Sequence, residues 1–184
     1  MGGTDSLIED AYRLAPAAPD EESVYGSCAP AWHSAASHDT AVQQWIDDMQ
    51  AAGIERVCCT LAAAQDEALN ANLGAYREAF GADRVLHAPI PDHRVGDEQL
   101  FEETILPFLE ESVVADEPVV VHCLDGIGRT GQVLAAWLVS DRGYHPQEAI
   151  DTVQQLGRDP TDPVARGNAS KDELMAFLTA VGRR

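Results

Sequence analysis

Short apolar runs alternate with segments of helical periodicity along this chain of 184 residues. The clearest run is PVVVHC at 118–123, whose length and valine content are typical of a buried strand. Further strands are predicted at 22–27, where a sheet edge is expected, at 54–61 and at 84–90. Helices are predicted at 41–53, 65–81, 97–113, 130–142, 146–157 and 170–182. Strands separated by helices predict an α/β fold, with a mostly parallel central sheet flanked by helices on both faces.

The length of the chain fits one domain with a sizeable core, and no repeat or linker divides it. We expect residues 1–21 to be loosely held and residues 22–184 to form the folded domain. No apolar run approaches the roughly 18 residues needed to cross a bilayer. The N-terminus also lacks a basic patch followed by an apolar stretch. The sequence therefore predicts a cytoplasmic protein without a membrane partner.

The charge balance is strongly acidic, with 31 acidic side chains against 12 basic ones and a formal net charge of −19. Lys171 is the only lysine in the chain. A solubilising surface explains a modest excess of this kind. An excess this large, spread along the chain, favours a salt-adapted (halophilic) cytoplasm, because concentrated salt screens the self-repulsion. Nucleic acid and anionic membranes are poor partners for such a surface.

The chain has four cysteines, at positions 28, 58, 59 and 123. Their number and spacing do not form a disulfide scaffold in a chain of this length. There is no C-x-x-C pair and no H-x-x-x-H partner, so no metal is predicted, and no other cofactor is indicated. Cys58 and Cys59 are expected to be small apolar residues of a buried strand, with a redox role left open.

The turn after strand 118–123 is rich in glycine and reads HCLDGIGRTG over residues 122–131. Ligands of open parallel sheets bind at the carboxyl ends of the strands. Successive backbone N–H groups that lead into a helix N-terminus form an anion cradle, and glycines let those groups point inward. The residues expected to line the anion are Leu124, Asp125, Gly126, Ile127, Gly128 and Arg129.

Cys123 lies at the base of this cradle, where the inward field favours a thiolate. The planar fork of Arg129 can grip two phosphate oxygens. A thiolate beneath a bound phosphate is placed for in-line attack, which gives a phosphocysteine intermediate. Thr130 is expected to donate a hydrogen bond to the sulfur and to help it leave. His122 is expected to orient the loop from beneath.

This stretch resembles the phosphate-binding loop of the cysteine-based protein phosphatases, H-C-x-x-G-x-x-R-[ST]-G, and the short chain is similar to their small dual-specificity branch. The resemblance covers about residues 22–180 and implies that 22–184 is a phosphatase catalytic domain. It implies that Cys123 is the nucleophile, that Arg129 binds phosphate and that an upstream aspartate is the general acid. It also implies phosphoprotein substrates and hydrolysis of phosphotyrosine, with phosphoserine and phosphothreonine left open.

The segment HAPIPDH at 87–93 resembles the acid loop of the small phosphatases. Asp92 is therefore favoured as the carboxyl that protonates the leaving group and then activates water. Asp97 is the competing candidate, and its position favours a helix N-cap instead. The sequence departs from the family pattern at Gly96, where proline is usual, so the rigidity of this loop is left open. His93 and Arg94 are expected to be exposed surface residues.

The sequence leaves the roles of two residues and several alternative functions open. Asp125 is expected to face solvent rather than to act in catalysis, and contact of Arg158 with substrate is left undecided. A phosphatase for a non-protein phosphate ester is the main functional alternative. A non-catalytic phosphate-binding module would lose the cysteine or the acid, and a rhodanese-type sulfurtransferase would lack the Arg-Thr-Gly helix start.

Overall fold

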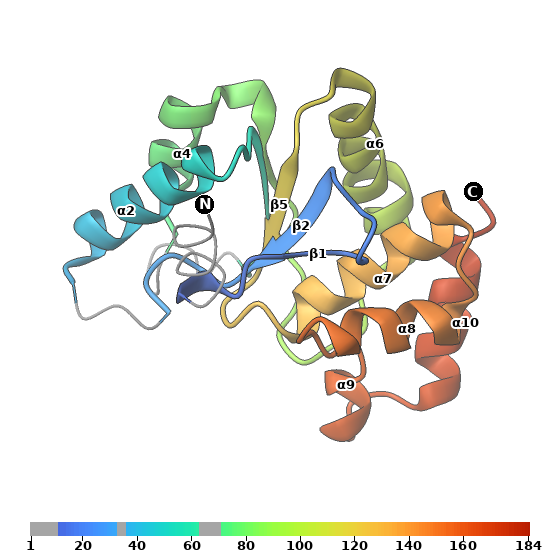
Figure 1. Cartoon of the computed structure of the whole chain (residues 1–184). Helices are drawn as coiled ribbons and strands as arrows, with labels where there is room; N and C mark the ends of the chain where they lie inside the picture. Colours follow the sequence, from blue (N-terminus) through green and yellow to red (C-terminus); the bar gives the residue numbers. More distant parts are fainter. Residues whose placement is uncertain (1–10, 33–35, 63–70) are drawn as a thin grey trace.

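The computed structural model describes residues 11–32, 36–62 and 71–184. A five-stranded sheet in the order β1-β2-β5-β3-β4 runs through the centre of the molecule (Figure 1). Its strands are β1 (Ala15–Pro16), β2 (Val24–Ser27), β3 (Arg56–Cys59), β4 (Val85–His87) and β5 (Val119–His122). All neighbouring pairs are parallel except β1 and β2. The predicted α/β fold with a mostly parallel sheet is confirmed.

β5 is the central strand and is buried along its whole length. Its side chains alternate between two apolar clusters, as the twofold period of a strand requires. Val119 and Val121 face the cluster formed with helices α6, α7, α8 and α10, whereas Val120 faces the cluster formed with α2 and α4. The two sets of helices cover opposite faces of the sheet (Figure 1). A continuous apolar run is the expected signature of a strand covered on both faces.

The helices are α2 (His38–Ala51), α4 (Leu73–Phe80), α5 (Glu98–Leu100), α6 (Leu106–Ala115), α7 (Gly128–Arg142), α8 (Pro146–Gln155), α9 (Asp162–Ala165) and α10 (Lys171–Val181). The prediction of one helix over 65–81 fails at Asn72, which caps α4 with its side chain. Residues 63–70 lie outside the described part of the chain. The short helix α9 was not predicted, because four residues, one of them Pro163, carry no readable periodicity.

The predicted helix from Asp97 to Val113 is observed as three consecutive segments. Between α5 and α6 lies one π-helical segment, η2 (Phe101–Ile105). Pro107 stands at the start of α6, where its missing N–H and its ring disturb the α-helical ladder of the preceding turn. The periodicity of the sequence indicates the helix but not this local change of winding.

The N-terminal segment packs against the domain from Tyr12 onward. β1 pairs with β2, so β2 is not the edge strand that the sequence predicted. Ala17 and Ala18, which follow β1, are buried. The described part of segment 1–21 is therefore integrated into the packing of the domain.

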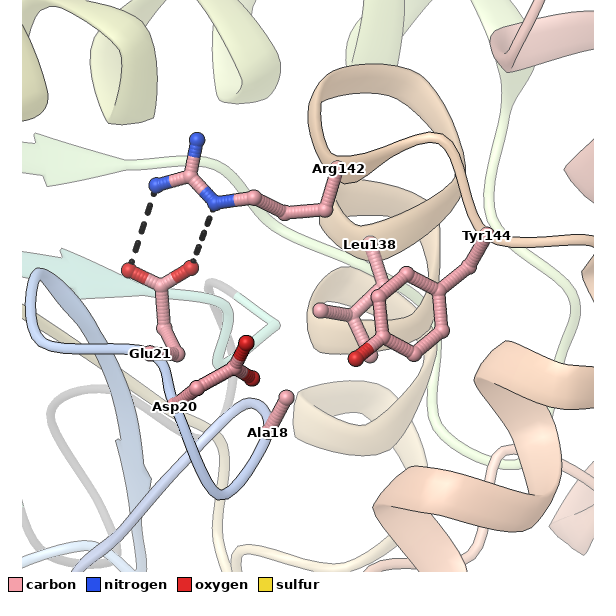
Figure 2. A pocket seen from close by; sticks show the side chains of 6 residues that line it. All are labelled: Ala18, Asp20, Glu21, Leu138, Arg142 and Tyr144. Carbon is pink, nitrogen blue, oxygen red and sulfur yellow. Dashed lines mark hydrogen bonds and ion pairs between the residues drawn. The ribbon is translucent and has the colours of Figure 1, made fainter.

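Glu21 anchors this segment to α7 (Figure 2). Its carboxylate pairs with the Arg142 guanidinium at 2.8 Å and accepts a hydrogen bond from Trp137 Nε1 at 3.1 Å. Burial alone would raise the pKa of Glu21, but the hydrogen bonds from Arg142, Trp137 and Ser23 outweigh burial and lower that pKa. The paired residues line a small cavity of about 110 Å³ together with Ala18, Asp20, Leu138 and Tyr144.

Candidate active site

The turn between β5 and α7 folds back against β2. Gly126 has φ +76°, a conformation that suits glycine, and a Cβ at this position would lie 2.5 Å from the carbonyl oxygen of Ser27. Asp159 N donates to the carbonyl oxygen of Ile127 at 3.1 Å from the other side. The turn therefore has backbone neighbours on both sides, which fix its path.

Cys123 lies at the base of this turn and is only 1% exposed. The hydroxyl of Thr130, in the first turn of α7, donates to its Sγ at 3.2 Å. The helix begins at Gly128, so its N-terminal dipole is directed toward the turn. A helix N-terminus directed at this turn favours the binding of an anion there.

Asp125 does not face solvent, contrary to the expectation from sequence. Its side chain turns into the loop, where Oδ1 accepts a hydrogen bond from Ile127 N at 3.0 Å. The same oxygen lies 3.6 Å from Cys123 Sγ, within reach of the thiol hydrogen. An aspartate commonly accepts from the N–H two residues ahead of it, and here that bond takes one inward donor of the anion cradle. The outward prediction failed because it considered the charge of Asp125 and not this local geometry.

Leu124, half-buried, packs against the apolar cluster of α2 and α4. Gly128 lies against the side chain of Asp162, where an added Cβ would meet the Asp162 Cβ at 3.2 Å. Of the six residues expected to line the anion, the structure therefore places Gly126 and Gly128 against neighbouring segments and turns Asp125 inward.

Arg129 joins this turn to the loop that follows β4. Its guanidinium is 4% exposed, and Nη2 lies 3.3 Å from Asp92 Oδ1. Nη1 also donates to the carbonyl oxygen of Ile90 at 3.4 Å. The structure thus brings together Arg129 and Asp92, which are far apart in the sequence. Asp92 is more open to solvent, with 38% of its side chain exposed.

Asp97 is the N-cap of α5, and its side chain accepts a hydrogen bond from Leu100 N at 3.0 Å. This is the role that the sequence favoured for it. Gly96 donates its N–H to Gln132 Oε1 at 2.9 Å, which a proline cannot do. A side chain at Gly96 would also collide with the ring of Phe101. The departure from the family pattern at this position therefore has a physical reason.

Gln132 is a site residue that sequence reasoning missed. Its Nε2 donates to the carbonyl oxygen of Arg94 at 2.8 Å, while its Oε1 accepts from Gly96. The amide thus ties the acid loop to α7 one residue after the phosphate-loop motif ends. The sequence shows only a glutamine directly before the apolar run that begins at Val133, and its burial is visible only in the structure.

His122 lies beneath the turn and is fully buried. Burial lowers the pKa of His122 to about 4. The neutral ring must then donate Nδ1–H to the carbonyl oxygen of Cys123, at 2.8 Å, because a carbonyl only accepts. Its Nε2 accepts from the hydroxyl of Tyr76 at 3.0 Å. His122 thus holds one ring orientation under the cysteine, in a packed cluster with Tyr76 and Trp45.

Arg158 lies under the phosphate loop rather than at a substrate surface. It is 3% exposed, and burial lowers its pKa to about 10. Nη1 donates to the carbonyl oxygen of Gly126 at 3.0 Å, and Nη2 donates to the carbonyl oxygens of Gly26 and Arg13. One guanidinium thus links the turn, β2 and the N-terminal segment.

The described residues contain no cluster of three or more His, Cys, Asp or Glu side chains arranged to hold a metal ion. No helix among them is both long enough and apolar enough to cross a membrane. The groups that the structure brings together at the site are the thiol of Cys123, the guanidinium of Arg129 and the carboxyl of Asp92.

Residues 33–143 match the family described as "Polymorphic toxin system, DSP-PTPase phosphatase", which is more than half of the 184 residues. The dual specificity protein phosphatase Mpk3 of Drosophila melanogaster is 34% identical over 97 residues, 53% of this chain and 23% of that protein. The dual specificity protein phosphatase OPG106 of Monkeypox virus is 29% identical over 72 residues, 39% of this chain and 42% of that protein. The matched stretch thus spans less than half the length of these curated relatives.

Among solved structures, Tk-PTP in the active form is 27% identical, with a TM-score of 0.65 over 89% of this chain and 94% of that chain. The structure of PTPMT1 in complex with PI(5)P has a TM-score of 0.66 over 93% of this chain and 97% of that chain. At 14% identity, this second likeness concerns the fold alone. The matched family model, the loop motif and the fold agree: this chain belongs to the DSP-PTPase family, the small cysteine-based dual-specificity phosphatases.

Proposed function

We propose that residues 22–184 form a catalytic domain that hydrolyses phosphate monoesters on protein side chains, phosphotyrosine in particular, through a phosphocysteine intermediate. The observation that carries this proposal is the 3.3 Å contact between Arg129 Nη2 and Asp92 Oδ1. It brings the acid loop over the loop that holds Cys123. A nucleophile and a proton donor can then act on the two sides of one phosphorus atom.

In the first step, the Cys123 thiolate attacks phosphorus and an S–P bond forms. The bond between phosphorus and the ester oxygen breaks, and that oxygen takes the proton of the Asp92 carboxyl. Arg129 and the loop N–H groups stabilise the charge on the transferring phosphoryl oxygens. Asp92 is left as a carboxylate.

In the second step, water attacks the phosphocysteine while Asp92 accepts its proton. The S–P bond breaks, inorganic phosphate forms and sulfur leaves as a thiolate. The hydroxyl of Thr130, 3.2 Å from Sγ, stabilises that leaving thiolate. The proton that Asp92 gives to the leaving alcohol is replaced by one from the attacking water, so the enzyme returns to its starting state and only water is consumed.

The side chains between the cysteine and the arginine favour substrates that carry a single phosphate. Leu124, Asp125 and Ile127 offer no positive charge, and the carboxylate of Asp125 turns into the cradle. A polyphosphorylated substrate would meet repulsion there rather than attraction. This supports protein phosphomonoesters over a highly charged lipid or nucleotide.

Turnover of an aryl phosphate and of matched phosphotyrosine and phosphoserine peptides tests the proposal. We expect Cys123→Ser to abolish turnover while phosphate analogues still bind, because the hydroxyl is a poor nucleophile in the same cradle. We expect Asp92→Asn to lose about 10²–10⁴-fold on a poor leaving group and little on a good one. Undiminished hydrolysis by Cys123→Ser would overturn the mechanism, and equal losses on both leaving groups would remove Asp92 as the acid.

A further inference from the structure

His93 directly follows Asp92 and adopts a backbone conformation that is uncommon for a residue with a side chain, φ +56°. Two groups hold it there. Its Nδ1 lies 2.8 Å from Asp162 Oδ2, and its carbonyl oxygen accepts from Asn168 Nδ2 at 2.9 Å. Both partners belong to the region of α9, far along the chain. The unusual backbone of His93 is therefore stabilised by contacts from outside the acid loop.

His93 in turn holds the carboxyl of Asp92 from one side. Its backbone N–H donates to Asp92 Oδ1 at 3.1 Å, and its Nε2 lies 3.4 Å from Asp92 Oδ2. Oδ1 of the same carboxyl also lies 3.3 Å from Arg129 Nη2. Asp92 is thus placed between a guanidinium and an imidazole.

The contact of Asp92 with Arg129 and its contact with His93 should change differently when substrate binds. The guanidinium of Arg129 is the group that grips phosphate, so its interaction with Asp92 weakens as its N–H groups turn to the phosphate oxygens. The imidazole of His93 contacts Asp92 and Asp162 and is not among the groups that we propose to bind phosphate. It remains beside Asp92 at the stage when the leaving oxygen needs the proton.

Asp162 provides a firm base for His93. Burial alone would raise the pKa of Asp162, but hydrogen bonds from His93 and Arg166 outweigh burial and lower that pKa. Oδ1 of this carboxylate pairs with Arg166 at 2.9 Å, while Oδ2 accepts from His93. Its side chain also packs on Gly128 of the phosphate loop. One carboxylate thus touches the phosphate loop and, through His93, the acid.

We propose that His93 and Asp162 are positioning residues that keep the acid Asp92 over the phosphate loop during catalysis. This inference rests on the proposed function, because it assigns a task only if Asp92 protonates the leaving group. Neither His93 nor Asp162 transfers a proton in this proposal. Loss of either side chain should therefore misplace the acid Asp92 and leave the nucleophile and the cradle intact.

The test measures kcat and KM for a series of aryl phosphates with good and poor leaving groups. His93→Gly removes the ring, and glycine adopts φ +56° without strain. Asp162→Ala removes the carboxylate that accepts from His93 Nδ1 and leaves the His93 side chain itself unchanged. For both variants we expect kcat on the poor leaving group to fall about 10-fold, with KM little changed and the good leaving group nearly unaffected.

Two further variants and one control complete the test. Asp162→Asn keeps an oxygen that accepts from His93 Nδ1, so it should restore much of the rate lost in Asp162→Ala. The double variant His93→Gly/Asp162→Ala should be no slower than either single variant, because both changes break one chain of contacts. Asp172→Ala, an exposed position in α10, is the control that removes a carboxylate elsewhere and should match wild type.

Several outcomes would overturn the inference: a wild-type rate of His93→Gly on the poor leaving group, equal losses on both leaving groups, or additive losses in the double variant. Thermal melts check that each variant is folded, and the comparison of Asp162→Ala with Asp162→Asn decides the matter if His93→Gly does not fold. Cys123→Ser and Asp92→Asn are measured in the same series. If both variants behave as proposed while His93→Gly keeps the wild-type rate, only this inference fails; if Cys123→Ser retains turnover, the proposed function fails as well.

Discussion

The phosphate loop and the acid loop face each other across the same site but are held in different ways. Cys123 and Arg129 are buried, and the loop that carries them rests on Arg158, on β2 and on backbone hydrogen bonds. Asp92 and His93 are each more than a third exposed and depend on side-chain contacts. The first loop is therefore built as a fixed cradle, because buried contacts leave no room for adjustment. The second can shift when its few polar contacts change.

The largest effect in this comparison is expected at Arg129, whose guanidinium faces the cradle. Arg129→Lys keeps the charge but loses the bidentate grip, so we expect kcat/KM to fall by about 10²–10³. The loss should be the same for good and poor leaving groups, because phosphate binding and not protonation is affected. Steady-state kinetics over aryl phosphates measure it. A rate near wild type would make Arg129 a structural residue and remove the contrast with Asp92.

The supports of the two loops should differ in what they contribute to stability. Arg158→Leu leaves buried carbonyl oxygens, including that of Gly126, without their donor, so we expect unfolding free energy to fall by about 2–4 kcal/mol. Asp162→Ala breaks half-exposed contacts and should cost less than about 1 kcal/mol. Urea unfolding of both variants gives the comparison. Similar losses would show that the acid loop is as firmly built as the cradle.

Asp125 introduces an adjustable element into the fixed cradle. Its carboxylate takes the N–H of Ile127 and lies beside Cys123, so a phosphate group must displace it. Asp125→Ala should lower KM for an aryl phosphate, and the inhibition constant of inorganic phosphate, by about 3–10-fold, since it removes a like charge from the anion site. Unchanged constants would show that the carboxylate leaves the cradle without cost.

The smallest and least local effect concerns the charge of the whole chain. With a net charge of −19, self-repulsion should be relieved by screening, so the melting temperature should rise by roughly a few degrees as potassium chloride is added. A salt-adapted protein would continue to gain stability well above physiological salt. Thermal melts over a potassium chloride series with wild type and Asp172→Ala test this, and a flat or falling midpoint removes the argument for salt adaptation.

The sequence predicted the mostly parallel sheet and the glycine-rich turn from β5 into α7, because both are local patterns. A valine run flanked by a glycine-rich turn shows its structure within about ten residues. The inward turn of Asp125 depends on one backbone N–H, and the support from Arg158 depends on three distant carbonyl groups. Such side-chain contacts to backbone groups follow no sequence periodicity, so they are visible only in the three-dimensional structure.

The acid loop depends even more on contacts that the sequence does not predict. Its motif pointed to Asp92, but the groups that hold the loop come from Gln132, Asp162 and Asn168. His93 was expected to be an ordinary surface residue, because exposure is the common state of a polar residue in a loop. A backbone in the left-handed region and a partner far along the chain distinguish it, and neither is visible in the sequence.

The central claim, that Cys123 carries the phosphoryl group and Asp92 serves both steps, can be tested by trapping the intermediate. Wild type and Asp92→Asn are mixed with an aryl phosphate that has a good leaving group, quenched in acid, and the peptide that contains Cys123 is analysed by mass spectrometry. The account predicts phosphate on Cys123 in both, with more in Asp92→Asn, because that variant forms the intermediate but lacks the base that activates water. Turnover without any phosphate on Cys123, or equal amounts in the two proteins, would contradict it.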